Sequence, residues 1–193
     1  MTESEKALKG EIFDTRDKEL FTMKQKTHKL CMEYNSLDEF NPRRNEIIKE
    51  MFNKVGEKVY FRGPINVTIG KHTTIGNNFF ANFNFTLLDS GKVEIGDDVL
   101  IAPNVSILAA NHPLDFYDRM QYKFSDGHEG VSEFSKPIKI GNGVWIAANV
   151  VICEGVTIGN HAVIGVNSVV MNDIPEGYIA YGCPAKPIRK VSR

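Results

Sequence analysis

Branched aliphatic residues recur at every sixth position late in the chain. From Lys139 to Val170 the repeated residue is isoleucine or valine, and a small residue follows it in most repeats. A period of six fits neither an amphipathic helix nor an alternating strand. It is typical of hexapeptide repeats, so the sequence predicts a mainly β protein with a parallel β-helix. The repeated positions are Ile140, Ile146, Ile152, Ile158, Ile164 and Val170.

The same period predicts how the aliphatic residues stack. Three repeats close one triangular coil, which places Ile140 against Ile158 and Ile146 against Ile164 in neighbouring coils. The small residue after each aliphatic lets the backbone bend where a bulky side chain would crowd the corner. One coil cannot bury its aliphatic residues alone, so several coils must stack. Earlier positions extend the stack towards the N-terminus: Ile69, Ile75, Ala81, Leu87, Ile95, Ile101 and Ile107.

Two breaks in the period mark segments that we expect to serve function. The step from Leu87 to Ile95 is too long for one repeat, which predicts a bulge at residues 89–92, and bulges often re-aim side chains at sites. The second break spans residues 111–136, where the sequence is polar and aromatic without any period. A long loop that interrupts a regular stack is usually placed for use.

Two amphipathic helices are predicted before the coils begin. Apolar positions three or four apart predict a helix from Asp14 to Tyr34, with Asp14 or Thr15 as its N-cap. A second apolar stripe predicts a helix that begins at Asn41 and is ended by Gly56. The first coil would otherwise expose unpaired backbone groups, so we expect these helices to cover the open end of the stack.

The chain is therefore predicted to have two parts. Residues 1–59 form the N-terminal helical cap, and residues 60–193 form the β-helix domain. The second part includes the excursion loop 111–136 and a C-terminal tail 173–193. Within that tail, residues 178–181 are expected to add a last strand.

Composition and charge exclude several classes of protein. The chain has 193 residues, a formal net charge of −1 and no long basic run, so nucleic-acid binding is not expected. No apolar stretch approaches the roughly 20 residues that a membrane span needs. The N-terminus lacks the apolar core of a signal peptide, which favours a cytoplasmic location. The three cysteines show no CxxC spacing, so neither disulfides nor a zinc site are predicted.

His112 is the best candidate for catalysis. It stands where the excursion loop leaves the coils, and an unperturbed histidine pKa near 6.5 suits a general base at neutral pH. His72 and His161 are predicted at outward corners of the coils. His28 falls on the first helix, and His128 lies in the loop, where it could touch a ligand.

Other polar residues have both structural and functional interpretations. Asn82 and Asp89 lie on the coil beside the loop, where they could grip a polyhydroxy acceptor or only hold turns. Cys153 occupies a slot that other repeats fill with a small residue, so we interpret it as packing rather than a nucleophile. Lys186 and Arg189 in the tail would suit phosphate groups.

Several motifs resemble those of a known family, the maltose and galactoside O-acetyltransferases of the hexapeptide-repeat acyltransferases. The Gly-Glu-Ile-Phe run at 10–13 and the end of the second predicted helix are similar as well, so the resemblance covers nearly the whole chain. The motifs that carry it are Asn-Phe-Phe-Ala-Asn-Phe at 78–83, Ile-Gly-Asp-Asp-Val-Leu-Ile-Ala-Pro at 95–103, His-Pro-Leu-Asp at 112–115, Ile-Gly-Asn-Gly-Val-Trp-Ile at 140–146 and Gly-Cys-Pro-Ala-Lys at 182–186.

The resemblance implies a left-handed β-helix, an exception to the right-handed crossover rule, in a homotrimer with active sites between subunits. It implies transfer of acetyl from acetyl-CoA to a hydroxyl of a sugar such as maltose, glucose or a galactoside, without a metal. His112 would be the general base. The implied acceptor contacts are Asn82, Asp89, Ser90 and Thr68. The implied acetyl-CoA contacts are Trp145, Ala148, Val166, Met171, Asn172, Lys186 and Arg189.

Two departures from the family pattern fall on the acceptor side. Thr68 lies in a run, 67–70, where maltose-type relatives usually carry aspartate, tyrosine and glycine, and the loop is longer around residues 122–129. The acceptor could therefore be an amino sugar, an antibiotic or a serine-like molecule instead. A non-catalytic trimeric β-helix or a metal-dependent hydratase is the remaining alternative, and the hydratase would need three converging histidines.

Overall fold

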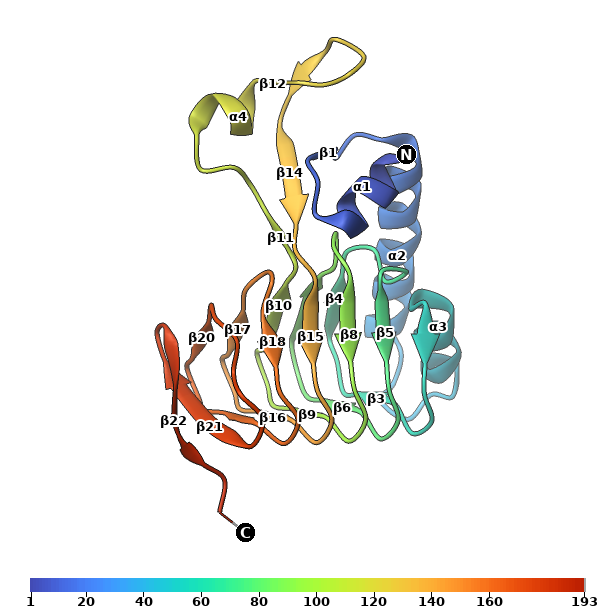
Figure 1. The fold of residues 1–193 in the computed structure, drawn as a ribbon. Helices are drawn as coiled ribbons and strands as arrows, with labels where there is room; N and C mark the ends of the chain where they lie inside the picture. The colour runs from blue at the N-terminus through green and yellow to red at the C-terminus, as the bar shows by residue number, and fades with distance from the viewer. Residues whose placement is uncertain (193) are drawn as a thin grey trace.

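The hexapeptide repeats form the three faces of a triangular coil, which Figure 1 shows for the computed structural model. The structure describes residues 1–192. Within them, each face is a sheet in which strands of successive coils pair in parallel. The first face contains β2 (Lys54–Val55), β5 (Thr73–Ile75), β8 (Val93–Ile95), β15 (Ile138–Ile140) and β18 (Thr157–Ile158).

The other two faces follow the same rule. The second contains β3 (Tyr60–Phe61), β6 (Phe80–Ala81), β9 (Leu100–Ile101), β16 (Trp145–Ile146), β19 (Val163–Ile164) and β21 (Tyr178–Gly182). The third contains β4 (Ile65–Val67), β7 (Phe85–Leu88), β10 (Ser106–Leu108), β17 (Val151–Ile152) and β20 (Val169–Val170). The predicted last strand is confirmed as β21, and β22 (Ala185–Lys190) folds back antiparallel on it.

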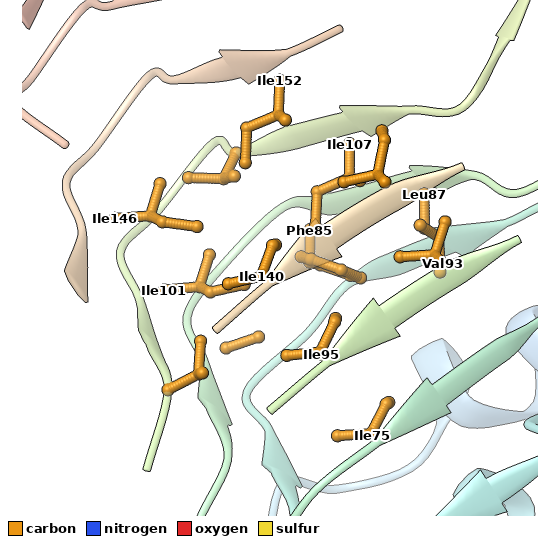
Figure 2. Packing of buried hydrophobic residues seen from close by; sticks show 14 of the residues in the cluster. Ile75, Phe85, Leu87, Val93, Ile95, Ile101, Ile107, Ile140, Ile146 and Ile152 are labelled. Carbon is orange, nitrogen blue, oxygen red and sulfur yellow. The ribbon is translucent and has the colours of Figure 1, made fainter. Parts of the chain in front are cut away.

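The strand registers confirm the predicted stacking of aliphatic residues. Ile140 pairs with Ile158, and Ile146 pairs with Ile164. All four side chains are buried in one continuous core. Figure 2 shows the labelled aliphatic side chains, Ile95 among them, gathered in the space between the faces. The six-residue period therefore marks the inward positions of the coil.

One corner of the coil is built from asparagines in the left-handed backbone region. Asn84, Asn104, Asn149 and Asn167 have φ angles of 58° to 60°. Their side-chain amides form a ladder along the stack, with N···O distances of 2.8, 3.0 and 3.0 Å between successive members. Asparagine tolerates this conformation better than most residues. The side chain of Asn84 therefore stabilises this corner of the coil.

The helices begin and end elsewhere than predicted. Helix α2 (Lys18–Ser36) starts after Asp17, whose carboxylate accepts from two backbone N–H groups, so the predicted N-caps Asp14 and Thr15 are wrong. The reason is that β1 (Phe13–Asp14) is a strand. Helix α3 (Arg43–Met51) ends well before Gly56 because the chain already enters β2, which pairs with β5.

A short first helix escaped the sequence analysis. Helix α1 (Glu3–Lys9) begins with a capping box between Thr2 and Glu5 and ends at Gly10 in the left-handed conformation. A threonine followed three residues later by glutamate is a helix-start signal that the sequence does contain. Ser4 of this helix reaches the buried His72.

Helix α2 lies along β4, the edge strand of the third face, and its side chains form hydrogen bonds with the backbone of that edge. Asn35 donates to the Ile65 carbonyl and accepts from the Ile65 N–H, both at 2.8 Å. About two turns earlier in the helix, Thr27 donates to the Ile69 carbonyl at 2.7 Å. These side chains take the place of a missing neighbouring strand. Apolar residues of α2 and α3 belong to the same core as the coils.

The excursion loop between β10 and β15 has its own structure and projects from the edge of the stack near α1 (Figure 1). Its strand β14 pairs antiparallel with β11 on one side and with β1 on the other. The N-terminal segment therefore fastens the loop. The loop elements are β11 (Ala110–Asn111), α4 (Phe116–Met120), β12 (Tyr122–Lys123), β13 (Glu129–Gly130) and β14 (Ser132–Ser135).

Candidate active site

A pocket of about 270 Å³ opens where the excursion loop, α2 and the corner after β7 meet. Three residues predicted for the site lie in it, namely His112, Thr68 and Ser90. The loop supplies one wall, α2 a second and the coil a third. The complete lining is Lys24, Thr68, Leu88, Ser90, Ala110, Asn111, His112 and Glu133.

The ring of His112 is held in one tautomer by the backbone of the loop. Its Nδ1 lies 2.6 Å from the carbonyl oxygen of Ser132. A carbonyl oxygen can only accept, so Nδ1 carries the proton and Nε2 keeps its lone pair. The residue is exposed in the single chain. This arrangement can take a proton from a group bound in the pocket.

The carbonyl that orients His112 is itself fixed from two sides. The Ser132 hydroxyl donates to the Asp118 carbonyl at 2.7 Å, and Ser132 pairs with Asp14 in the β1–β14 ladder. On the next strand, the Asn111 amide donates to Glu154 at 2.9 Å. The position of the imidazole thus depends on contacts with the N-terminal segment and the coils.

Asp89 lies behind the pocket wall. It is fully buried, and its carboxylate accepts from the Ile69 N–H at 2.8 Å and from the Thr73 hydroxyl at 2.7 Å. Burial raises the pKa of the Asp89 carboxyl above its usual range. The structure therefore places Asp89 as a support for its neighbours Thr68 and Ser90, outside the pocket lining.

His72 is buried, so its predicted place at an outward corner is wrong. Its Nδ1 lies 2.8 Å from the Ser90 carbonyl, and its Nε2 lies 3.1 Å from the Ser4 hydroxyl. The carbonyl must accept, so Nδ1 donates and Nε2 accepts from Ser4. Helix α1, which the sequence pattern did not predict, covers this histidine.

Asn82 is not brought to the pocket of its own chain. It follows β6 on the second face, and its side-chain oxygen accepts from the Phe83 N–H at 2.9 Å. The residues implied for acetyl-CoA are also apart from the pocket, on the C-terminal coils. Trp145, Val166 and Met171 expose 51%, 58% and 55% of their surfaces, which is high for large apolar side chains.

The remaining acetyl-CoA candidates share that end of the stack. Ala148 is half-buried near a corner, and Asn172 is exposed after β20. Lys186 and Arg189 are exposed on β22.

Two other residues considered in the sequence, His128 and Cys153, lie in surroundings that favour a structural role. His128 of the loop places its Nδ1 beside the Asp126 carboxylate and its Nε2 3.1 Å from the carboxylate of Asp14 in β1. Cys153 is half-buried, and burial raises the pKa of its thiol, which disfavours the nucleophilic thiolate. All three cysteines are free.

Lys24 and Glu133 line the pocket but were missed in the sequence. Lys24 lies four residues after Leu20 and three before Thr27, both buried, so a lysine on the inward stripe of α2 was the available signal. No such sequence signal pointed to Glu133, because strand β14 has no period and its position depends on pairing with β1.

Residues 1–192 contain no group of three histidine, cysteine or carboxylate side chains arranged to hold a metal ion. Among the helices of this part of the chain, none is long and apolar enough to cross a membrane.

The sequence matches two family descriptions. Residues 6–56 match "Maltose acetyltransferase hexapeptide capping motif", and residues 137–172 match "Bacterial transferase hexapeptide (six repeats)". The galactoside O-acetyltransferase of Escherichia coli K12 is 43% identical over 150 residues, which cover 78% of this chain and 70% of that protein.

Solved structures agree over the whole chain. A galactoside acetyltransferase in complex with coenzyme A has a TM-score of 0.90 at 38% identity, covering 100% of this chain and 92% of that one. A maltose O-acetyltransferase from Clostridium difficile 630 has a TM-score of 0.91 at 38% identity, covering 100% and 99%. A hexapeptide-repeat acetyltransferase from Vibrio cholerae, solved with acetyl coenzyme A, has 0.86 at 37%, covering 100% of both chains.

The fold and the site thus define a hexapeptide-repeat acyltransferase with a left-handed β-helix. Within that class, the chain belongs to the family of maltose and galactoside O-acetyltransferases. The predictions of the family, the fold and the enzyme class are confirmed. The prediction of acetyl-CoA as co-substrate agrees with the coenzyme A and acetyl coenzyme A held by two of these relatives.

Proposed function

We propose that this protein transfers acetyl from acetyl-CoA to a hydroxyl of a neutral sugar, such as maltose, glucose or a galactoside, with His112 as general base. The observation that carries the proposal is the Nδ1 contact of His112 with the Ser132 carbonyl at 2.6 Å, beside the pocket. That contact leaves Nε2 as the proton acceptor. The relatives named for maltose and galactosides support a sugar as acceptor.

The reaction follows from this geometry in two steps. His112 Nε2 takes the proton of the acceptor hydroxyl while the oxygen of that hydroxyl attacks the thioester carbonyl carbon. The tetrahedral intermediate then collapses, the carbon–sulfur bond breaks, and the imidazolium returns the proton to the sulfur of coenzyme A. The products are an acetylated sugar and free coenzyme A, and no residue of the protein is acetylated.

The second face of the coil supports assembly into a homotrimer. Its outward positions form an apolar ladder in register across six strands, whereas the first face carries lysine, threonine and glutamate outward. An apolar stripe of this length on a surface calls for a partner. The ladder consists of Tyr60, Phe80, Leu100, Trp145, Val163 and Ile179.

In such a trimer the site would be completed between subunits. Asn82 follows β6 on the apolar face, so a second copy could present it to the acceptor near His112. Trp145, Ala148, Val166, Met171 and Asn172 would line the groove for the pantetheine arm, with Lys186 and Arg189 at the phosphates. Thr68 and Ser90 would contact the acceptor, with Asp89 supporting them.

The test is thiol release from acetyl-CoA, measured across a panel of neutral sugars, amino sugars, antibiotics and serine. We expect neutral sugars to be acetylated and His112→Ala to lower turnover by roughly 10²–10⁴-fold with folding intact. His28→Ala, an exposed histidine of α2, is the matched control and should keep full activity. Near-normal turnover in His112→Ala would refute the base, and exclusive use of a non-sugar acceptor would refute the acceptor class.

A further inference from the structure

The tip of the excursion loop folds around a second histidine. This tip lies in residues 122–129, where the loop is longer than the family pattern. In the hairpin of β12 and β13, the Phe124 N–H donates to the His128 carbonyl at 2.9 Å, and the two rings stack with centroids 4.7 Å apart. Phe124 is buried. The imidazole of His128 is therefore held in the loop tip by an aromatic ring.

Each ring nitrogen of His128 faces a carboxylate. Nδ1 lies beside Asp126, and Nε2 lies 3.1 Å from Oδ2 of Asp14 on β1. Nε2 is shielded from solvent, and its approach to Asp14 is not aligned as a hydrogen bond, so the contact is electrostatic. A neutral imidazole has one N–H and one lone pair, and the lone pair would face a carboxylate oxygen. Only the imidazolium presents a proton to both carboxylates.

Carboxylates outnumber cations around this ring, in and beside a pocket of about 210 Å³. The hydrogen bond with His128 holds the pKa of the Asp126 carboxyl below its usual range. On the hairpin itself, Lys123 and Glu129 are exposed. The charged groups of the surrounding elements are Glu3, Lys6, Asp14, Arg16, Asp17 and Asp126. A positively charged ring therefore has more partners here than a neutral ring has.

Asp14 connects this ring to the candidate base. It pairs with Ser132 in the ladder between β1 and β14. The carbonyl oxygen of Ser132 accepts from His112 Nδ1 at 2.6 Å, which sets the tautomer of the base. The Asp14 N–H donates to Glu3 of α1 at 2.6 Å, so β1 is also anchored to the cap. A contact that draws the loop tip onto Asp14 therefore acts on the carbonyl that holds the base.

We propose that His128 is a positioning residue for His112. Its imidazolium joins Asp126 in the loop tip to Asp14 on β1, and this His128 clamp keeps β14 seated against β1. The Ser132 carbonyl then stays in place, and Nε2 of His112 stays available to the pocket. When His128 loses its proton, its lone pair repels one carboxylate and the clamp loosens. This inference rests on the proposed function, because His112 is the base that it positions.

The clamp and the base need opposite protonation states. His112 can take a proton only when its ring is neutral, so turnover falls on the acid side. The clamp needs the charged ring of His128, so turnover also falls as that ring is deprotonated with rising pH. The pH profile of kcat should therefore be bell-shaped, and its alkaline limb should belong to His128.

The experiment measures kcat and the KM for acetyl-CoA from about pH 5 to about pH 9, with whichever acceptor is used best. The variants are His128→Gln, which removes the titrating ring, and Asp14→Asn, which keeps the backbone of β1. We expect both to lower kcat about tenfold on the acid side, because displacing a catalytic group slightly is costly. The loss should vanish on the alkaline side, with KM unchanged. His28→Gln, an exposed histidine of α2, is the control.

A third variant, His128→Lys, separates charge from packing. It keeps a cation beside Asp14 throughout this pH range, so kcat should hold and the alkaline decline should disappear. The stacking on Phe124 is lost in this variant and in His128→Gln alike. Equal losses in the two variants, or a loss in His128→Gln that does not vary with pH, would overturn the proposal.

NMR of the histidine rings tests the positioning without turnover. In isotope-labelled protein, His112 should show the Nδ1–H tautomer, and His128→Gln should mix in the other tautomer. If this change is seen while His112→Ala keeps full turnover, the proposed function fails and the clamp stands. If His112→Ala abolishes turnover, but neither the tautomer nor kcat responds to His128→Gln, the clamp alone fails.

Discussion

At the scale of single residues, the pocket beside His112 depends on buried polar side chains behind its wall. Asp89 accepts from Ile69 and Thr73, and His72 donates to the Ser90 carbonyl. Both residues hold the corner that carries Thr68 and Ser90. The shape of the pocket wall depends on these bonds because protein interiors are close-packed.

The burial of Asp89 leads to a prediction about how the free energy of unfolding depends on pH. Its pKa is raised by burial, so the folded state favours the protonated form, and stability from this group is present at low pH and lost as pH rises through the folded pKa. Asp89→Asn carries no such charge. In urea unfolding at pH 4, close to the ordinary aspartate pKa, and at pH 8, the unmodified protein should lose stability relative to Asp89→Asn at the higher pH. An opposite trend would mean that its hydrogen bonds outweigh desolvation.

At the scale of elements, α2 acts as the missing first strand of the third face. Its side chains reach three carbonyls of that edge, those of Ile65, Val67 and Ile69. The same helix delivers Lys24 to the pocket. The excursion loop is likewise part of the scaffold, because β14 bridges β1 and β11 and presents the carbonyl that holds His112. The cap, the loop and the site therefore depend on one another.

The contact between Asn35 and Ile65 tests this role of α2. Asn35→Ala leaves the N–H and the carbonyl of a buried strand residue without partners, and we expect a loss of about 2 kcal/mol in the free energy of unfolding. Asn66→Ala is the control on the same strand, because its exposed side chain makes no hydrogen bond within residues 1–192. Equal effects of the two substitutions in chemical denaturation would contradict the capping role.

At the scale of the whole molecule, the three faces of the coil differ in what they expose. The apolar ladder of the second face contrasts with the outward Thr74, Glu94 and Lys139 of the first face. Leu100, at the middle of the ladder, exposes 51% of its surface. A face of this kind is suited to burial against a second copy, and a site shared between copies would couple assembly to activity.

Leu100→Glu places a charge in that ladder. We expect the proposed trimer to dissociate, because a buried unpaired charge is costly at an interface, and we expect acetyl transfer to be lost with it. Light scattering after size exclusion measures the assembly, and thiol release measures the activity. Thr74→Glu on the polar first face is the control. A trimer that persists in Leu100→Glu would remove this face from the interface.

The local period was enough to predict the coil, because stacking repeats a single relation between neighbours. Ile140 and Ile158 meet through one closed turn, and a last strand at residues 178–182 continues the same rule. The predicted helix boundaries are wrong where the chain pairs with a distant segment instead, as at Asp14, which pairs with Ser132. His72 was misplaced for the same reason, since Ser4 covers it.

The sequence by itself determined the β-helix, its interruption at the loop and His112 as the candidate base, because each of these follows from spacing along the chain. Only the tertiary structure decided which side chains share the pocket. Lys24 and Glu133 stand more than a hundred residues apart in the chain and meet there with His112. Such a meeting depends on how α2 and β14 dock on the coils, and contacts between distant segments leave no period in the sequence.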